Sequence, residues 1–277
     1  KTAYEMLRSL VGSEMCIRDS LELARNYQLD LTKFPIGPLI TEEMVRVELD
    51  HIPTSTQPIP ISIDENNLNG MILYGGGGHA KALIDLIRTI GQYHIAAVID
   101  DGFPKGHLVM GIPVVGDSSI LTTVYQQGIR LAVNAIGGIS NIRHRIQGFD
   151  TLTKVGFTFP ILIHPSAVVE QSARLSAGTQ VFPQAYVGSE VEVGFGVIIN
   201  SGTIVSHDCQ LGDYVNLSPG AILAGEVTVG EGALIGMGVT INLRVKIGAY
   251  ARIGNGATIK SDVPENGIVR AGTIWPK

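Results

Sequence analysis

The sequence has few cysteines, few charged residues and no long apolar run, and each shortage excludes a class of protein. Its two cysteines, Cys16 and Cys209, are too few for a disulfide framework, which favours the reducing cytoplasm. Charged residues make up only 16% of the 277 residues and form no Lys- or Arg-rich run, so we expect no nucleic-acid partner. Apolar stretches end well before the roughly 18 residues that a membrane span needs, and no Cys/His cluster has zinc-ligand spacing. We therefore expect neither a membrane span nor a bound metal.

Aliphatic residues and glycine, by contrast, are abundant. Hydrophobic residues make up 45% of the chain and glycine contributes 34 residues, whereas aromatic residues make up 6%. This composition excludes disorder as a general description and favours regular, tightly stacked β-structure. The length is sufficient for about two domains.

The N-terminal part of the chain, residues 1–69, carries no recognisable chemistry. Residues 1–20 lack the apolar core and the cleavage site of a signal peptide and resemble translated adapter sequence, so we expect a non-native segment. The alternative is a short native helix. Residues 21–69 contain five prolines and a polar run, which predicts a linker or the truncated tail of an upstream domain.

Residues 70–160 alternate between strand-like and helix-like patterns. The predicted strands cover residues 71–74, 95–99, 112–115 and 131–136, and the predicted helices cover 81–90, 117–127 and 141–147. This alternation predicts a Rossmann-like domain, in which a small parallel sheet has helices on its faces.

A glycine loop lies between the first predicted strand and the first predicted helix. Unpaired N–H groups at a helix N-terminus favour an anion, and glycine lets a phosphate approach the backbone. The loop also matches a loose dinucleotide fingerprint, with an acidic pair at the end of the second strand. The predicted substrate-binding residues are Gly75, Gly76, Gly77, Gly78, His79, Asp100 and Asp101. The alternatives are a turn without a ligand, a histidine that only caps the loop, and acids that are only solvated.

From Ile163 to Ile259, every sixth residue is Val, Ile or Leu. The residue four places later is small, and glycine often follows the aliphatic residue directly. This six-residue period is the signature of a β-solenoid, which we predict over residues 161–277. Three hexads form one triangular coil. The aliphatic side chains fill its interior, and neighbouring coils lie about 4.8 Å apart.

One hexad, residues 205–210, departs from the pattern. His207 takes the third place, which points outward, where a neutral imidazole is a good general base near neutral pH. Asp208 could orient the ring, and Gly225, one coil along, would leave room for a substrate beside it. We predict His207 and Asp208 as catalytic residues and assign Cys209 to packing. The alternative is an ordinary surface histidine.

Together these segments resemble one family, the bacterial hexapeptide-repeat sugar O- and N-acyltransferases. This family includes sialic acid O-acetyltransferases and nucleotide-4-amino-sugar N-acetyltransferases. The resemblance extends from residue 71 to about residue 263 and rests on residues 74–81, 163–168, Asn200, 207–209, 218–220 and 224–225. It implies a left-handed parallel β-helix, acetyl-CoA as co-substrate, a nucleotide-sugar or sugar acceptor in the glycine loop, and a homotrimer with acetyl-CoA between subunits. It also implies that His207 is the base and that Asp208 supports it.

The acetyl-CoA-binding residues that the resemblance implies are Asn200, Asn216, Ala224, Gly225 and Met237. The sequence departs from the family at two places. Asn216 stands where several relatives have a second histidine, and residues 270–277 replace the usual Gly-x-Pro-Ala-basic ending.

We therefore expect acetyl-CoA-dependent acetylation of an amino group on a nucleotide-linked sugar, by direct transfer to the acceptor. The alternatives are a sialic acid-type sugar O-acetyltransferase and a non-catalytic nucleotide-binding solenoid. A solenoid carbonic anhydrase would need three converging histidines, but the solenoid has only His164 and His207, whose separation is not a whole number of coils. A nicotinamide oxidoreductase would not need the solenoid, and residues 70–160 are few for a whole dinucleotide site.

Overall fold

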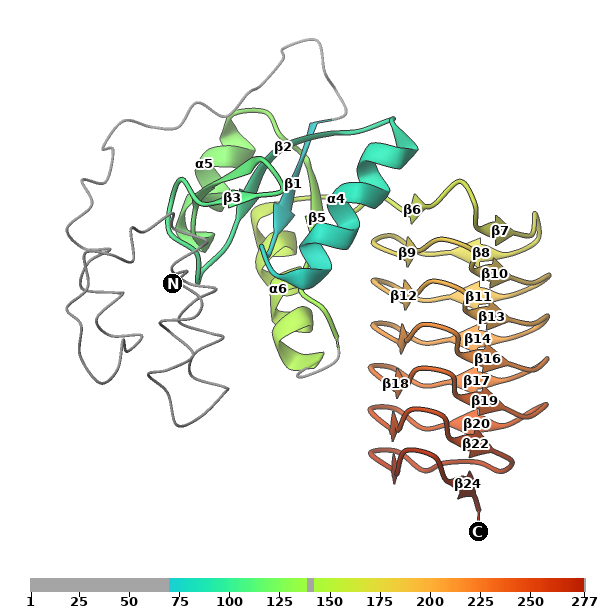
Figure 1. Ribbon diagram of the computed structural model, residues 1–277. Coiled ribbons are helices and arrows are strands. Elements are labelled where there is room, and N and C mark those ends of the chain that lie inside the picture. The colour runs from blue at the N-terminus through green and yellow to red at the C-terminus, as the bar shows by residue number, and fades with distance from the viewer. Residues whose placement is uncertain (1–69, 139–141, 277) are drawn as a thin grey trace, which may run out of the picture. The chain divides into compact units, whose positions relative to one another are not determined.

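The computed structural model describes residues 70–138 and 142–276, which form an α/β part followed by a β-helix (Figure 1). The predictions for residues 1–69 lie outside the described residues.

The α/β part is built on a five-stranded sheet with the order β3-β4-β2-β1-β5. Its strands are β1 (Gly70–Tyr74), β2 (His94–Ile99), β3 (Leu108–Val109), β4 (Ile112–Gly116) and β5 (Leu131–Asn134). Its helices are α4 (Gly78–Ile90), the short 3₁₀ helix η2 (Ser118–Ile120), α5 (Leu121–Gln126) and α6 (Ile142–Val155). The pairs β1–β2, β1–β5 and β2–β4 are parallel, as predicted, whereas β3 adds an antiparallel edge that the sequence did not predict.

Helix α6 is twice as long as predicted. The predicted end at residue 147 precedes Gly148, but this glycine is buried inside the helix. A Cβ atom at Gly148 would lie 2.9 Å from Nδ2 of Asn134, so the missing side chain lets α6 pack closely against β5. The helix ends instead before Gly156, which has a φ of +106°.

The β-helix consists of two-residue parallel strands in three sheets. One sheet contains β6 (Leu162–Ile163), β9 (Gln180–Val181), β12 (Ile198–Ile199), β15 (Asn216–Leu217), β18 (Leu234–Ile235), β21 (Arg252–Ile253) and β23 (Ile268–Val269). The second contains β7 (Val168–Val169), β10 (Tyr186–Val187), β13 (Ile204–Val205), β16 (Ile222–Leu223), β19 (Thr240–Ile241), β22 (Thr258–Ile259) and β24 (Ile274–Trp275). The third contains β8 (Arg174–Leu175), β11 (Glu192–Val193), β14 (Gln210–Leu211), β17 (Thr228–Val229) and β20 (Lys246–Ile247).

The second residue of these strands points into the prism, and from Val181 to Val269 it is almost completely buried. Because successive coils pair positions that are three hexads apart, as in Val187 with Val205, the aliphatic side chains form continuous ladders. The predicted fold class, an α/β domain followed by a left-handed parallel β-helix, is confirmed. The last coil is shorter than three hexads, since Ile253 pairs with Val269, and the ladders continue beyond the periodic part of the sequence.

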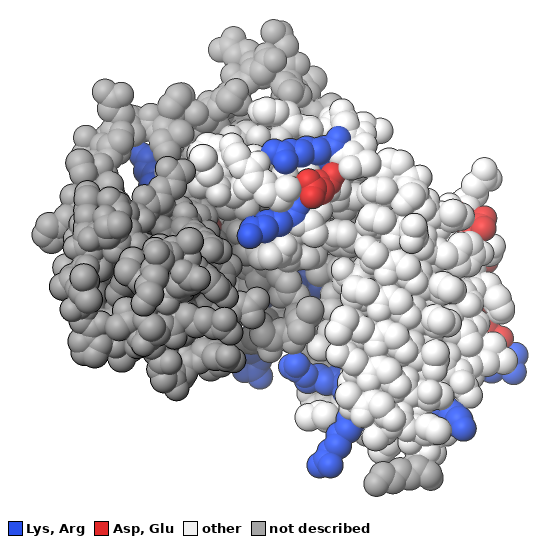
Figure 2. Space-filling model, viewed as in Figure 1, with Lys and Arg blue, Asp and Glu red and all other residues white. Residues whose placement is uncertain are grey.

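The core of the α/β part includes side chains of the first β-helix coils. Leu162, Phe182 and Ile198 belong to the same buried cluster as residues of β1, α4 and β5. Figure 2 shows that most of the described surface in view is uncharged, with Lys and Arg side chains both over the α/β part and toward the C-terminal coils. Within residues 70–138 and 142–276, no helix combines the length and apolar character that crossing a membrane requires.

Candidate active site

His207 lies at a corner of the β-helix, in the turn between β13 and β14. Its Nδ1 is 2.7 Å from Oδ2 of Asp208, and the two side chains are 59% and 55% exposed. Asp208 has a φ of +60°, a left-handed conformation that this corner turn requires. Since a carboxylate only accepts hydrogen bonds, the proton of the neutral ring resides on Nδ1 and Nε2 keeps its lone pair. The pair therefore presents a basic nitrogen at the surface of the corner.

Gly225 lies beneath the imidazole, on the next coil. A Cβ atom at Gly225 would lie 2.6 Å from both Nε2 and Cε1 of His207, so only glycine accommodates the ring in this position. The carbonyl of His207 accepts a hydrogen bond of 2.9 Å from the N–H of Glu226, which fixes the two coils relative to each other. The sequence predicted that this glycine leaves room for a substrate; the imidazole itself fills that space.

The other predicted acetyl-CoA residues lie at different places on the prism. Ala224 shares the corner of His207, whereas Asn200 and Met237 lie at the corner that precedes the sheet of β13. Asn216 lies on the outer face of β15, is 2% exposed, and its Nδ2 has no hydrogen-bond partner among the described residues. One chain therefore does not bring these five residues together. The reason is that each coil has three corners. Residues therefore share a corner only when they are separated by about one whole coil or by several whole coils.

The glycine loop leads from β1 into the N-terminus of α4. Gly75 has a φ of +108°, and its N–H donates to the carbonyl of Ile99 at 2.8 Å. A Cβ atom at Gly77 or Gly78 would meet open space. Gly77 is the N-cap of α4 and no side chain caps the helix. The start of α4 is thus accessible to a ligand and carries the partial positive charge of a helix N-terminus.

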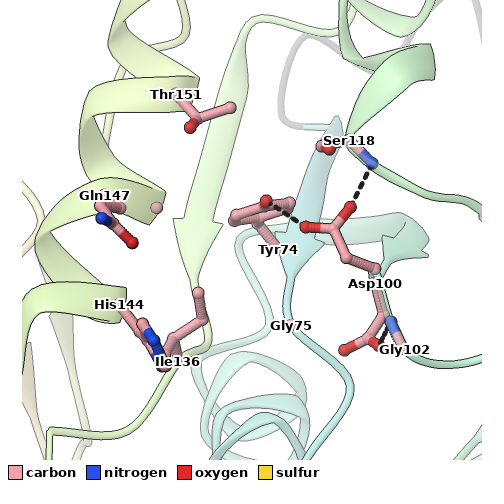
Figure 3. Close-up of a pocket in the computed structure, with 11 residues that line it drawn as sticks. Tyr74, Gly75, Asp100, Gly102, Ser118, Ile136, His144, Gln147 and Thr151 are labelled. Carbon is pink, nitrogen blue, oxygen red and sulfur yellow. Dashed lines mark hydrogen bonds between the residues drawn. The ribbon is translucent and has the colours of Figure 1, made fainter. Parts of the chain in front are cut away.

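A pocket of about 640 Å³ lies at the carboxyl ends of the parallel strands, beside this loop (Figure 3). It includes the point between β1 and β5 where the strand order reverses, the usual ligand position in an open α/β sheet. Its lining residues are Tyr74, Gly75, Asp100, Asp101, Gly102, Ser118, Ile136, His144, Gln147, Gly148 and Thr151. The structure therefore places Gly75, Asp100 and Asp101 of the predicted set in one pocket.

The two carboxylates of the pocket hold its loops together. Asp100 accepts hydrogen bonds from the N–H groups of Gly76 at 2.6 Å and Gly102 at 2.8 Å. Asp101 accepts one from the hydroxyl of Tyr74 and one from the N–H of Ser118, both at 2.7 Å. Burial would raise the pKa of Asp101, but these hydrogen bonds outweigh it and the pKa is lowered. The pKa of Tyr74 is raised to about 12, mainly by burial and then by Asp101.

Comparison with known proteins identifies the family. The chain matches the PglD N-terminal domain model over residues 71–149 and the bacterial transferase hexapeptide model (six repeats) over residues 226–261. It is 37% identical to perosamine N-acetyltransferase from Caulobacter crescentus, solved with CoA and GDP-perosamine, and covers 92% of that chain and 72% of its own, with a TM-score of 0.68. The chain belongs to the hexapeptide-repeat sugar N-acetyltransferase family.

Two other solved structures are similar to this chain. The acetyltransferase domain of PglB from Neisseria gonorrhoeae FA1090, solved with acetyl coenzyme A, is 32% identical, with 72% of this chain and 95% of that chain covered and a TM-score of 0.66. WeeI from Acinetobacter baumannii AYE, at 24% identity and a TM-score of 0.60 over 72% of this chain and 94% of that one, shares the fold. The search of curated protein sequences found no match.

Family membership confirms two sequence predictions, an acetyl-CoA-dependent sugar acetyltransferase and acetyl-CoA as its co-substrate. In the parts of the chain that the structure describes, no group of three His, Cys, Asp or Glu side chains could hold a metal ion. The individual site residues remain predictions.

In the present structure, His79 is not among the residues that line the pocket. Its Nε2 is 2.8 Å from Oε1 of Gln180 on β9, and Nε2 of Gln180 donates to the carbonyl of Asn134 at 2.9 Å. Because a carbonyl only accepts, the Gln180 amide orientation is fixed and His79 donates from Nε2. Burial lowers the pKa of His79 to about 4, so the ring is neutral near pH 7.

Sequence reasoning missed the pocket residues on α6. His144, Gln147, Gly148 and Thr151 are spaced i, i+3, i+4 and i+7, which places them on one helix face. This spacing was visible in the sequence, but the predicted helix stopped at residue 147. Tyr74, a polar aromatic residue at the end of a buried apolar strand, was a second available signal.

Proposed function

We propose that the protein transfers the acetyl group of acetyl-CoA to the amino group of a nucleotide-linked amino sugar, with His207 as general base. The observation that carries this proposal is the 2.7 Å contact between His207 Nδ1 and Asp208 Oδ2, which leaves Nε2 with its lone pair on a side chain that is 59% exposed. No described residue forms a hydrogen bond with Nε2. The Caulobacter crescentus relative, which binds CoA and GDP-perosamine, supports the same pair of substrates.

The reaction at this corner is direct acyl transfer. The acceptor nitrogen attacks the thioester carbonyl while Nε2 of His207 takes its proton, so the C–N bond forms. The tetrahedral intermediate then releases the thiolate of CoA, which receives that proton from the imidazolium. Asp208 stabilises the imidazolium electrostatically. None of the described hydrogen bonds uses the N–H of Gly225, which is therefore free to stabilise the oxyanion.

The acceptor is held by the α/β part in this proposal. The open N-terminus of α4 at Gly77 and Gly78 suits the diphosphate, because unpaired N–H groups and the helix dipole favour an anion. The adjoining pocket has two carboxylates and no Lys or Arg in its lining, which disfavours the diphosphate there and suits the uncharged nucleoside.

We also infer a cytoplasmic homotrimer. The outer face of the sheet that contains β13 exposes Val168, Ile204, Ile222 and Ile274, with exposed fractions of 39% to 54%. An apolar face of this kind is typical of a surface that a second chain covers. Neighbouring copies would also bring other corners of the prism, with Asn200 and Met237, towards His207. The free, buried thiol of Cys209 suits a reducing compartment.

Acetyl transfer tests this function directly. Purified protein is incubated with acetyl-CoA and a panel of UDP-, dTDP-, GDP- and CMP-linked sugars, with and without an amino group, and thiol release and acetylated product are measured. We expect acetyl transfer only to the amino sugars. The product should be an amide, which resists mild alkali. An alkali-labile ester would show an O-acetyltransferase instead, and nucleotide binding without any transfer would show a non-catalytic solenoid.

The base is tested by His207→Ala, with His164→Ala as the matched control on the β-helix. Loss of the general base lowers kcat by about 10²–10⁴-fold. The exposed position of His207 predicts an unchanged melting temperature. Near-normal turnover in His207→Ala would show that another residue is the general base.

A further inference from the structure

The pocket beside the glycine loop has two unlike walls. Figure 3 shows His144, Gln147 and Thr151 projecting from α6 on one side, and Asp100, Gly102 and Ser118 on the other, with Tyr74 between them. A ligand that fills this pocket would contact a carboxylate wall and an α6 wall. The two walls differ in how many of their polar groups are already engaged.

The carboxylate wall is occupied by the protein's own donors. Both oxygens of Asp100 accept hydrogen bonds from backbone N–H groups, and both oxygens of Asp101 accept bonds from Tyr74 and Ser118. A ligand that replaced the N–H of Gly76 or the hydroxyl of Tyr74 would leave a buried group without a partner, which costs free energy.

The α6 wall is different. The side chains of His144, Gln147 and Thr151 form no hydrogen bond with any residue that the structure describes, and the first two are exposed. Their spacing along one helix face brings an amide, an imidazole and a hydroxyl to the same pocket. An amide presents one acceptor and two donors, and this combination matches the edge of a nucleobase.

We propose that the α6 wall, with Gln147 at its centre, recognises the nucleobase of the nucleotide-sugar acceptor, and that Asp100 and Asp101 maintain the pocket without reading the base. This inference rests on the proposed function, because it requires a nucleotide-linked acceptor. The diphosphate lies outside the pocket at the start of α4, which leaves the nucleoside as the part that reaches α6.

The test measures the binding of GDP, UDP, dTDP and CMP to the purified protein by calorimetry. We expect the wild type to prefer one base. In Gln147→Leu and Thr151→Val, the preferred nucleotide should bind about tenfold more weakly, because a base-reading hydrogen bond is lost. The ratio between the preferred and the other nucleotides should fall correspondingly. Gln126→Leu, an exposed glutamine on α5, is the matched control and should keep both values.

Asp101→Asn tests whether Asp101 recognises the base or only maintains the pocket. This variant should have a lower melting temperature and should bind all four nucleotides more weakly by the same factor, so that the order of their affinities is unchanged. If Gln147→Leu and Thr151→Val keep the wild-type ratios, or if Asp101→Asn abolishes the preference, the assignment to α6 is wrong. A wild type that binds all four equally would also overturn it. A wild type that binds none would instead contradict the proposed nucleotide acceptor, before any variant is compared.

Discussion

The properties of His207 depend on contacts with two neighbouring residues. Asp208 fixes the ring through Nδ1, and Gly225 provides the space in which the ring lies. The rest of the corner is backbone, because the coils are joined there by hydrogen bonds such as that from Glu226 to the carbonyl of His207. A reactive side chain can therefore change without disturbing the aliphatic interior.

Gly225→Ala tests the contribution of the glycine. Its Cβ atom would lie 2.6 Å from Nε2 of His207, so the exposed imidazole must rotate away from its present position. We expect kcat to fall at least about tenfold through misplacement of the base, while the melting temperature changes little. Leu243→Ala, one coil further along the same corner, is the control. Unchanged kcat in Gly225→Ala would show that the ring position in the structure is not the productive one.

His79 gives folding stability a pH dependence of its own. Its pKa is about 4 in the folded protein against about 6.5 in the unfolded chain, mainly because the ring is buried. The unfolded state therefore binds more protons between these values. The stabilisation is fully present above pH 6.5 and is lost as the pH falls toward 4, by about 3 kcal/mol at most.

Thermal or urea unfolding between pH 7.5 and pH 4 measures this loss. His79→Gln keeps a hydrogen-bonding side chain but cannot titrate, so its free energy of unfolding should fall less steeply with pH than that of the wild type. Equal slopes in His79→Gln and the wild type would contradict the assigned pKa.

At the scale of elements, α6 supports two sets of contacts at once. One face lines the pocket, and the other carries Arg145 and Phe149, which are fully buried. The guanidinium of Arg145 donates to the carbonyls of Gly196 and Tyr214 in the β-helix. Burial lowers the pKa of Arg145 to about 9. Phe149 packs against the rings of Phe195 and Tyr214, so the position of the pocket wall depends on the β-helix.

Gly148→Ala tests this close packing. The added Cβ atom would lie 2.9 Å from Nδ2 of Asn134 and 3.0 Å from Cδ1 of Ile136, so these side chains or α6 must shift. We expect a loss of about 1–3 kcal/mol in unfolding free energy, despite the better helix propensity of alanine. Nucleotide binding should also weaken. Asp150→Ala, an exposed position on the same helix, is the control; equal stabilities of the two variants would show that the contact can relax.

At the scale of the whole molecule, the triangular cross-section separates residues that are close in sequence. Asn200 and His207 are in neighbouring hexads and lie at different corners, whereas His207 and Gly225 are one coil apart and touch. A complete acetyl-CoA site from the five predicted residues therefore needs more than one copy of the chain, which is why we infer a trimer.

Ile204→Lys tests that assembly. A charge in the middle of the exposed apolar face would be desolvated on association, so we expect a smaller mass by light scattering and a large loss of turnover. Ile268→Lys, on the outer face of another sheet and 73% exposed, should leave mass and turnover unchanged. A wild-type protein that is monomeric at micromolar concentration would contradict the inferred trimer.

The fold of this protein could be predicted from its sequence because a structure that buries residues at regular intervals has hydrophobic residues at regular intervals in its sequence. A β-helix buries every sixth residue along most of the stretch from Ile163 to Ile259, and the α/β part alternates apolar strands with amphipathic helices. The candidate base was also visible, since His207 interrupts a regular array. The antiparallel β3 was missed because so short a strand carries too little pattern, and the length of α6 was missed because glycine normally ends helices.

Only the tertiary structure decided which polar residues face the pocket. His79 and Asp100 were predicted together, but packing directs His79 to Gln180 and engages Asp100 with backbone donors. Gln147 and Thr151 face the pocket because α6 packs against β5, which precedes it directly, and against β-helix residues such as Gly196 and Tyr214, which are distant in sequence. Hydrophobic periodicity is a local property that a sequence displays directly. The engagement of a donor or acceptor depends on residues far away along the chain, and folding alone brings them into contact.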